Sequence, residues 1–358
     1  MKWCPPVRIR RVLLLAGMTA ALASCSTVRF YAQAARGQAQ MLRKARPIPQ
    51  VLAEPATSPV LRQRLELVQK LHAFASTDLS LPADAIFTRY ADLGRRYAVW
   101  VVYAAPEFSM QGKGWWYPFV GTLKYRGFFD AAPAKAEAEK LKAQGYDVLM
   151  SGVEAYSTLG WFKDPVLNTF IGRNEGDLAE LMFHELTHVR LFLPGDTDFN
   201  EALATAVGQE GARRWFISQH APAKLKAYEQ ELAKDDEIVH LLLRTREELT
   251  QLYKTSQPPD QMRLAKASIL ATLQTRYQEL KQRWQGDSRY DRFFAKPINN
   301  ARLDTIAAYH DLVPEFTQKI RAHGNDLNAF FLEMKALKDR SRTERYAALG
   351  ASQLEPAP

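Results

Sequence analysis

The feature that most constrains this fold is a short apolar stretch that carries two histidines and a glutamate. Residues 181–188 read Leu-Met-Phe-His-Glu-Leu-Thr-His, which sets His184 and His188 four positions apart. On an α-helix such positions lie on the same face, so both imidazoles can reach one metal ion. The apolar neighbours indicate a helix buried on several sides, where ligands can be held rigidly. The sequence therefore predicts a buried helix with a metal-binding face.

The residue that follows the first histidine suits hydrolytic chemistry. Glu185 is turned about 100° around the helix from His184, where its carboxylate can take a proton from an attacking water. Zinc is the metal that such a site selects, and it lowers the pKa of a water to about 7. We therefore expect His184 and His188 to bind Zn2+ and Glu185 to act as the general base. Chance is the alternative, because a single buried histidine more often only satisfies a hydrogen bond.

A third ligand is expected on the next helix. Residues 194–198 form a turn, and a helix is predicted to start near Asn200 with Asp198 as its N-cap. If this helix runs back antiparallel, its first turns lie level with the two histidines. Glu201 fits that level, whereas Glu210 lies about 13 Å further along. We expect Glu201 to be the ligand, and capping explains the two aspartates of the turn more simply.

The N-terminus has the pattern of a secretion signal with a lipid attachment site. Three arginines precede an apolar run of about 12 residues, too short to span a bilayer as a mature helix. The run ends in Leu22-Ala-Ser-Cys25, which resembles the bacterial lipobox, where the signal is cut before a lipid-carrying cysteine. We expect lipid attachment at Cys25, and Ser26 after it favours the outer membrane, facing the periplasm. The alternatives are an ordinary signal peptide and an uncleaved anchor.

The charge balance excludes one class of partner. The chain has 48 Lys and Arg against 39 Asp and Glu, a net charge of +9. Four basic residues fall in the first 24 positions, so the remainder carries 44 basic and 39 acidic residues, or +5. No basic run is interleaved with aromatics, so we expect no nucleic-acid partner. A solvated surface explains the surplus most simply, and a weak attraction to anionic membrane is the other interpretation.

Hydrophobic patterning divides the body into a mixed part and a helical part. β-branched and aromatic runs predict three strands, with one helix between the second and third. From about residue 175 onward the periodicity is helical, and the two longest helices are predicted to form an αα-hairpin. The expected strands are 97–103, 115–125 and 146–156, and the expected helices include 60–74, 132–144, 177–193, 200–219, 223–254, 259–285, 300–312 and 315–337.

Longer segments carry a resemblance to a known family. The motif His-Glu-x-x-His followed by Asn200-Glu201-Ala202 looks like the gluzincin arrangement of two histidines and a glutamate. Four groups of segments resemble the bacterial putative aminopeptidase family: 125–129, 155–165, 183–188 with 196–201, and 299–303 with 309–311. The resemblance implies a zinc peptidase and, more loosely, an aminopeptidase. One departure is Thr205, which stands where thermolysin-like enzymes place an aspartate that orients a histidine.

Two further roles follow from the expected cleft. Zincins commonly bind peptide as an added strand beside the motif helix, and residues 152–162 are the expected edge. Glu154 on that edge could hold the α-amine of a substrate, as a glutamate does in one gluzincin aminopeptidase group, although an outward-facing carboxylate is the simpler interpretation. Tyr309 and His310 are candidates to donate a hydrogen bond to the developing oxyanion, with two surface residues as the alternative.

The fold class we predict is α+β: a zincin-like small mixed sheet, the histidine-bearing helix pair, and a large helical C-terminal part. The expected regions are a lipoprotein signal peptide (1–24), a tether (25–58), a zincin-like metallopeptidase region (59–220), a helical region that completes the cleft (221–340), and a flexible tail (341–358). The expected function is zinc-dependent hydrolysis of peptide bonds at the periplasmic membrane face by an aminopeptidase. A periplasmic quality-control endopeptidase and a non-catalytic zinc-containing lipoprotein scaffold are the alternatives.

Overall fold

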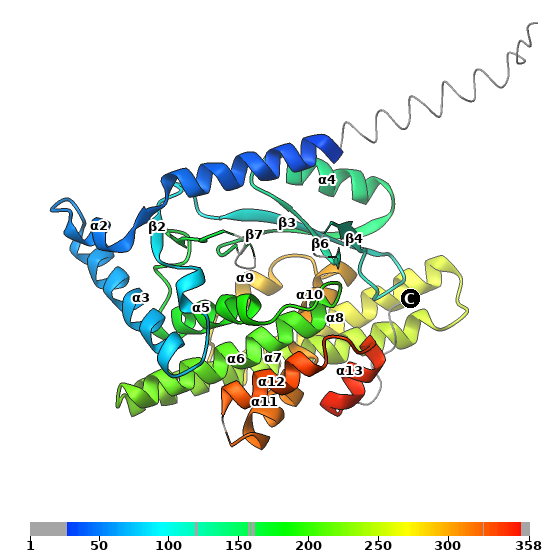
Figure 1. Cartoon of the computed structure of the whole chain (residues 1–358). Coiled ribbons are helices and arrows are strands. Elements are labelled where there is room, and N and C mark those ends of the chain that lie inside the picture. The colour runs from blue at the N-terminus through cyan, green and yellow to red at the C-terminus, as the bar shows by residue number, and fades with distance from the viewer. Residues whose placement is uncertain (1–26, 119–120, 157, 159–161, 325, 352–358) are drawn as a thin grey trace, which may run out of the picture.

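A three-stranded antiparallel sheet lies at the centre of the molecule (Figure 1). This computed structural model describes residues 27–118, 121–156, 158, 162–324 and 326–351, without the side chains of Ala85 and residues 307–310. Strand β3 (Val99–Pro106) pairs with β6 (Tyr125–Phe128) on one side and β7 (Tyr146–Val153) on the other. The α+β class predicted from the sequence is confirmed.

The pleat of β3 sends its side chains to two different layers. On one face Val102 and Ala104 pack with Phe128 against α4 (Ala131–Ala143) and the N-terminal helix (residues 27–44). On the other face Val101 and Tyr103 point toward α10 (Asn300–His310). Helices α5 (Glu175–Arg190) and α6 (Thr197–Ser218) lie on this second side of the sheet. The sheet therefore separates the N-terminal helix from the helices that carry the histidine motif.

Two smaller sheets complete the strand content. One joins β1 (Arg46–Pro47), β2 (Arg89–Ala91) and β8 (Val166–Leu167), and the other is the hairpin of β4 (Trp115–Tyr117) and β5 (Gly121–Leu123). The single strand predicted over residues 115–125 is therefore divided. Gly121 has a φ of +78°, and a Cβ there would meet the backbone of Gly195 at 2.9 Å. A left-handed turn at this close approach breaks the run.

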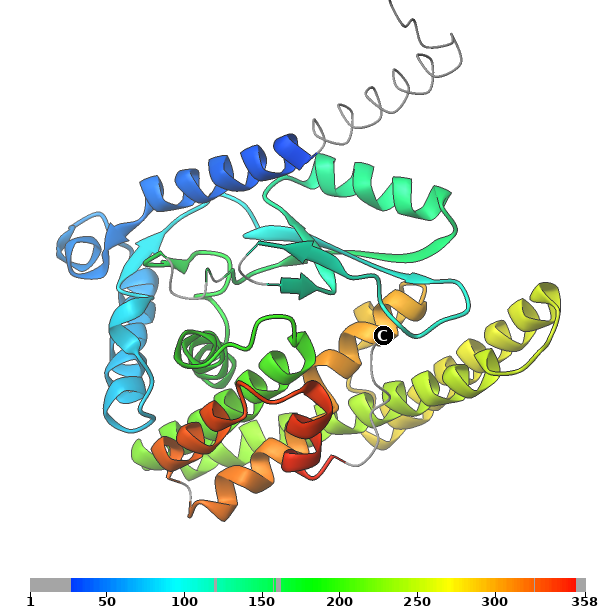
Figure 2. The same cartoon turned by 45° about the vertical axis from the view of Figure 1, so that its right-hand side comes forward.

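Long helices make up the C-terminal half. Helices α7 (Pro222–Tyr253) and α8 (Pro259–Arg283) form the predicted hairpin, which projects from the body (Figure 2), and the short α9 (Asp291–Phe294) packs against α8. The one helix predicted over 315–337 is two, α11 (Val313–Ala322) and α12 (Leu327–Ala336). Between them Gly324 has a φ of +61°, and Asp326 caps α12.

The two segments predicted to be a tether and a flexible tail are both packed where the structure describes them. Within 25–58, the N-terminal helix and α2 (Ile48–Ala53) bury apolar side chains such as Met41 and Val51 before α3 (Pro59–Thr77) begins, and η1 (Ala83–Ala85) follows α3. Within 341–358, α13 (Arg342–Leu349) starts with a capping box and buries Tyr346 and Leu349. Both segments pack because their apolar faces have a core to cover.

Among the described residues, no helix is both long enough and apolar enough to cross a bilayer. The predicted signal peptide and Cys25 lie outside the described residues.

Candidate metal centre

Helix α5 holds the two histidines in a rigid frame. Asn174 caps the helix by accepting a hydrogen bond from the Asp177 backbone N–H at 2.9 Å, and two acidic residues in the first turn complement the helix dipole. Met182, Phe183 and Leu186 are fully buried around the motif. The remaining face carries His184 and His188, as the four-residue spacing predicts.

The connection from α5 to α6 is closed by buried polar side chains. The Asn200 side-chain amide donates to the Leu193 carbonyl at 2.7 Å, and its oxygen accepts from the Leu193 N–H at 2.8 Å. Asp196 is the N-cap of α6 and accepts from the Phe199 N–H. The predicted cap, Asp198, lies instead in the first turn of the helix. This tight connection fixes the first turn of α6 beside the end of α5.

Three potential ligand atoms meet where the helices face each other. Nε2 of His184 lies 3.1 Å from Nε2 of His188, and Oε2 of Glu201 lies 3.3 Å and 3.6 Å from these two atoms. Atoms bound tetrahedrally to one zinc at 2.0–2.2 Å are separated by about 3.3 Å. The donor set, two imidazoles and a carboxylate, and its spacing therefore fit a zinc ion. The structure brings together the three residues that the sequence proposed as ligands.

The other carboxylates considered as metal ligands form ion pairs with basic residues. Glu210 pairs with Arg214 at 2.8 Å, within α6. Asp198 pairs with Lys124 at 2.9 Å and with Arg342 at 2.7 Å. Neither carboxylate belongs to the group of three potential ligand atoms, which consists of His184, His188 and Glu201.

The two imidazoles keep the Glu201 carboxylate ionised. Burial alone would raise the pKa of Glu201, but the charge of His188 and hydrogen bonds with both imidazoles hold it well below its usual range. Burial would lower the pKa of His188, but the Glu201 carboxylate raises it. Nδ1 of His188 is buried without a hydrogen-bond partner among the described residues. The carboxylate is thus ionised and ready to neutralise a cation shared with the imidazoles.

A tyrosine that the sequence analysis did not single out as a site residue stands beside this centre. Burial raises the pKa of the Tyr125 hydroxyl well above its usual value, and the nearby charges of Glu201 and Glu185 raise it further. Its ring lies 5.6 Å from that of Tyr103, its partner across β6 and β3. Tyr125 therefore remains protonated next to the ligand and the expected base. Its segment, 125–129, carries the family resemblance but no local pattern that marks a site residue.

A glycine allows the two helices to approach closely. A Cβ on Gly208 would lie 2.8 Å from the carbonyl oxygen of Glu180 and 3.4 Å from Cβ of His184. Gly208 is two turns after Glu201 on α6, and Glu180 is one turn before His184 on α5. Only hydrogen at this position lets the helices pack as they do, which keeps Glu201 within reach of the imidazoles.

The last helix is attached to the start of α6. Arg345 donates to the buried Asp196 carboxylate at 2.6 Å, and the Tyr346 hydroxyl donates to the same residue at 3.1 Å. Arg342 of the same helix pairs with Asp198, which is also held by Lys124. Helix α13 therefore clamps the turn from which Glu201 is positioned.

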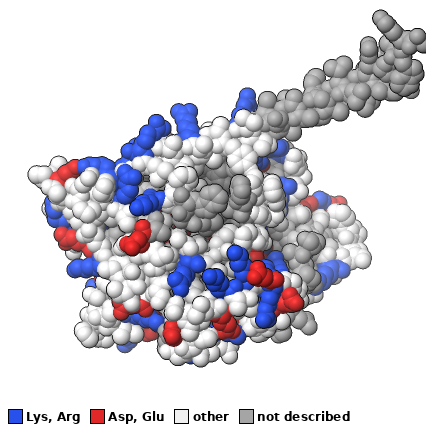
Figure 3. All heavy atoms as spheres, in the orientation of Figure 1, with Lys and Arg blue, Asp and Glu red and all other residues white. Residues whose placement is uncertain are grey.

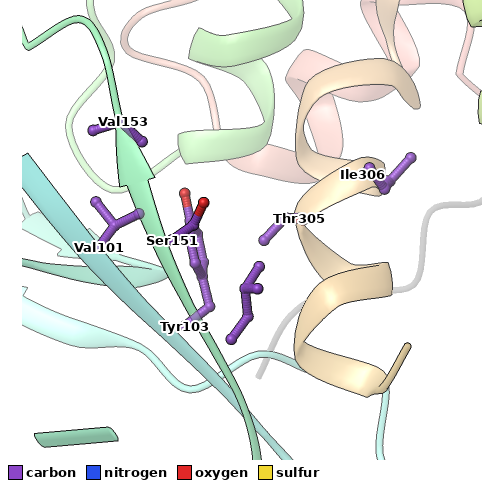
Figure 4. Close-up of a pocket in the computed structure, with 7 residues that line it drawn as sticks. Val101, Tyr103, Ser151, Val153, Thr305 and Ile306 are labelled. Atoms are coloured by element: carbon purple, nitrogen blue, oxygen red, sulfur yellow. The ribbon is translucent and has the colours of Figure 1, made fainter. Parts of the chain in front are cut away.

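An apolar cavity of about 210 Å³ lies between the sheet and α10 (Figure 4). Val101, Tyr103, Leu149, Ser151 and Val153 line it from β3 and β7, and Thr305 and Ile306 line it from α10. Tyr103 connects this cavity to Tyr125 and so to the ligand group. No lining residue is charged, which suits an uncharged side chain.

The other sequence-derived candidates are placed less centrally or not described. Glu154 follows the end of β7 and pairs with Arg173 at 2.9 Å, so its carboxylate already has a cationic partner. The expected edge over 152–162 continues as a strand only to Val153. The side chains of Tyr309 and His310 lie outside the described residues, although α10 carries both positions.

Comparison with known proteins gives one match. A family model described as "Putative aminopeptidase" matches residues 29–349. None of the curated proteins and none of the solved structures matches the chain. The matched region includes α5, α6, the sheet and all of α13.

Proposed function

The chain belongs to the family described as putative aminopeptidases, and on that premise we propose that it is a zinc-dependent peptidase acting on the amino ends of peptides. The observation that carries the proposal is the spacing of His184, His188 and Glu201, which suits a tetrahedral zinc with one open position. A structural zinc site closes its coordination with a fourth protein ligand. Among the described residues, the group holds three.

Each of the neighbouring side chains then has its own role in the proposed hydrolysis. A bound zinc lowers the pKa of a water to about 7 and polarises a carbonyl. Glu185 takes the proton from the attacking water and delivers it to the leaving amine. Tyr125, neutral and donating, gives a hydrogen bond to the oxyanion that develops on the scissile carbonyl. The cavity beside Tyr103 receives an apolar side chain of the substrate.

The role of Glu185 is tested by removing its charge alone. Glu185→Gln should retain zinc and thermal stability while activity falls by roughly 10²–10⁴-fold, because the ligands remain and the base is lost. Glu210→Gln is the matched control, since it removes a carboxylate that pairs with Arg214 instead of facing the ligands. Equal activity in both variants would exclude Glu185 as the general base. No activity in the unsubstituted chain would favour the non-catalytic zinc-containing scaffold.

The choice between exo- and endopeptidase is tested with the substrate's amine. An aminopeptidase must recognise a terminal ammonium, and Glu154 could do so only by exchanging Arg173 for it. We expect cleavage of free peptides and not of the same peptides N-acetylated, with Glu154→Gln weakening turnover of the free form. Internal cleavage of both forms at similar rates would establish the alternative, an endopeptidase of periplasmic quality control.

The proposed location is the periplasmic face of the outer membrane, with the lipid on Cys25. The support is the sequence Leu22-Ala-Ser-Cys25. Cys25→Ser should yield a soluble or unprocessed chain, measured by membrane fractionation and the mass of the N-terminus. A correctly cut variant that still fractionates with membranes would disprove lipid attachment at this residue.

A further inference from the structure

The N-terminal helix is fixed in rotation by its inner face. Gln33 accepts a hydrogen bond from the Phe129 N–H at 3.0 Å and donates to the Gly127 carbonyl at 3.4 Å. A Cβ on Gly37 would fall 2.0 Å from the ring of Phe129, so the helix lies directly on that side chain. Met41 continues the same stripe and is buried. With this face held against the sheet layer, the opposite face must point outward.

That outward face carries a regular row of arginines. Arg29, Arg36 and Arg43 are spaced by seven residues, which returns to within about 20° on an α-helix. All three side chains are exposed. The outward positions between them include Ala32, Ala39 and Gln40, so no acidic side chain stands among the guanidinium groups.

The row has no acidic counterpart on its own segment. From residue 27 to residue 53 the sequence contains no Asp or Glu, and the first acid is Glu54, which pairs with Arg46. Arg29 and Arg36 form no ion pair with any described residue, and Arg43 donates only to the Ala39 carbonyl. Lys and Arg side chains stand along the upper edge of the molecule, where Figure 1 places this helix (Figure 3).

We propose that this arginine face docks the body flat onto an anionic phospholipid surface. Guanidinium groups bind phosphate oxygens in pairs, and a row of them spaced along a helix matches a planar array of headgroups. Val28, 62% exposed near the start of the helix, adds apolar area that can enter the interface. An acid-free face of this length has the charge complementary to such lipids.

Docking in this way orients the molecule. The central sheet lies between the N-terminal helix and the α5–α6 pair (Figure 1). The metal centre therefore faces away from the lipid and toward substrates in the aqueous phase. The docking itself does not depend on peptidase activity, so the two proposals fail separately.

Vesicle binding tests the proposal. The described residues begin at 27, so a chain that starts at Ser26 keeps them all and lacks Cys25 and the predicted apolar leader. This chain should co-sediment with phosphatidylglycerol vesicles and much less with phosphatidylcholine vesicles, and binding should weaken as salt rises. Changing Arg29, Arg36 and Arg43 to Gln should reduce binding by about fivefold per arginine, roughly 100-fold in all.

The control removes the same charge elsewhere. Arg321, Lys335 and Lys338 are exposed on or beside α11 and α12, on the side of the body opposite the N-terminal helix. Changing these three to Gln should alter vesicle binding by less than about twofold. Equal losses in both variants would overturn the proposal in favour of a general charge effect. Binding to polyglutamate but not to phosphatidylglycerol would overturn it in favour of an acidic protein partner.

Discussion

Substituting Gly208 by alanine should loosen the metal centre without touching a ligand. The added Cβ would lie 2.8 Å from the Glu180 carbonyl oxygen, whereas a C···O contact needs about 3.3 Å. The helices must therefore separate by about 0.5 Å. Because the obstacle is backbone within a helix, it cannot rotate aside as a side chain could.

The expected magnitudes follow from this displacement. Overpacking costs about 1–3 kcal/mol, and replacing glycine by alanine within a helix recovers about 1 kcal/mol. The free energy of unfolding should therefore fall by at most about 2 kcal/mol. Zinc binding should suffer more, because ligand distances tolerate only about 0.2 Å. We expect the zinc dissociation constant to rise by roughly 10–100-fold, as when the supports of a metal site are removed.

The assay is zinc competition with a chromophoric chelator, together with thermal unfolding with and without zinc. Gly176→Ala is the matched control. Gly176 lies about two turns before His184 on the same helix. Its added Cβ would also meet an atom at 2.8 Å, but that atom belongs to the ring of Tyr228 and not to a helix backbone. The control should lose some stability and keep zinc affinity. If Gly208→Ala binds zinc as tightly as the unsubstituted chain, the helix spacing does not set the ligand geometry.

Burial raises the pKa of Asp311 to about 6 in the folded protein, against about 3.9 in the unfolded chain, so the free energy of unfolding should fall by up to about 3 kcal/mol as the pH rises from below 4 through 6. Asp311→Asn should remove this loss of stability, and an unchanged pH profile of urea unfolding in the variant would disprove it. Arg345→Ala leaves the buried Asp196 carboxylate with less counter-charge, so the free energy of unfolding should fall by about 3 kcal/mol and zinc binding should weaken. Lys335→Ala, at an exposed position, should change neither quantity. Tyr125→Phe should lower kcat by about 10²-fold with zinc content unchanged, and full activity would exclude it as the oxyanion donor.

Local pattern predicted much of what positions the site. The four-residue spacing of His184 and His188 defines a helix face whatever surrounds it, and α5 spans 175–190 against an expected 177–193. The level of Glu201 followed from the rise of a helix and the length of the turn, because both are nearly constant. The hairpin of α7 and α8 likewise follows from apolar stripes interrupted at two prolines.

Features that depend on distant partners were not predicted. Tyr125 belongs to the centre only because β6 pairs with β3 in one register, which no local pattern in 121–128 specifies. Asp196, not Asp198, caps α6 because Asp198 is drawn to Lys124 and Arg342, which are far away in sequence. The order of 27–53 and 342–349 also depends on apolar surface that other elements supply.

The contacts between α13 and the start of α6 can form only late in the synthesis of the chain. Asp196 and Asp198 are translated about 145 residues before Arg342 and Arg345, which neutralise them. At roughly 5–20 residues per second, the counter-charges follow the acids by about 7–30 s. During that interval the Asp196 carboxylate lacks the counter-charge of Arg345, whereas Asp198 can already pair with Lys124. The turn that positions Glu201 is therefore completed only after α13 has been translated.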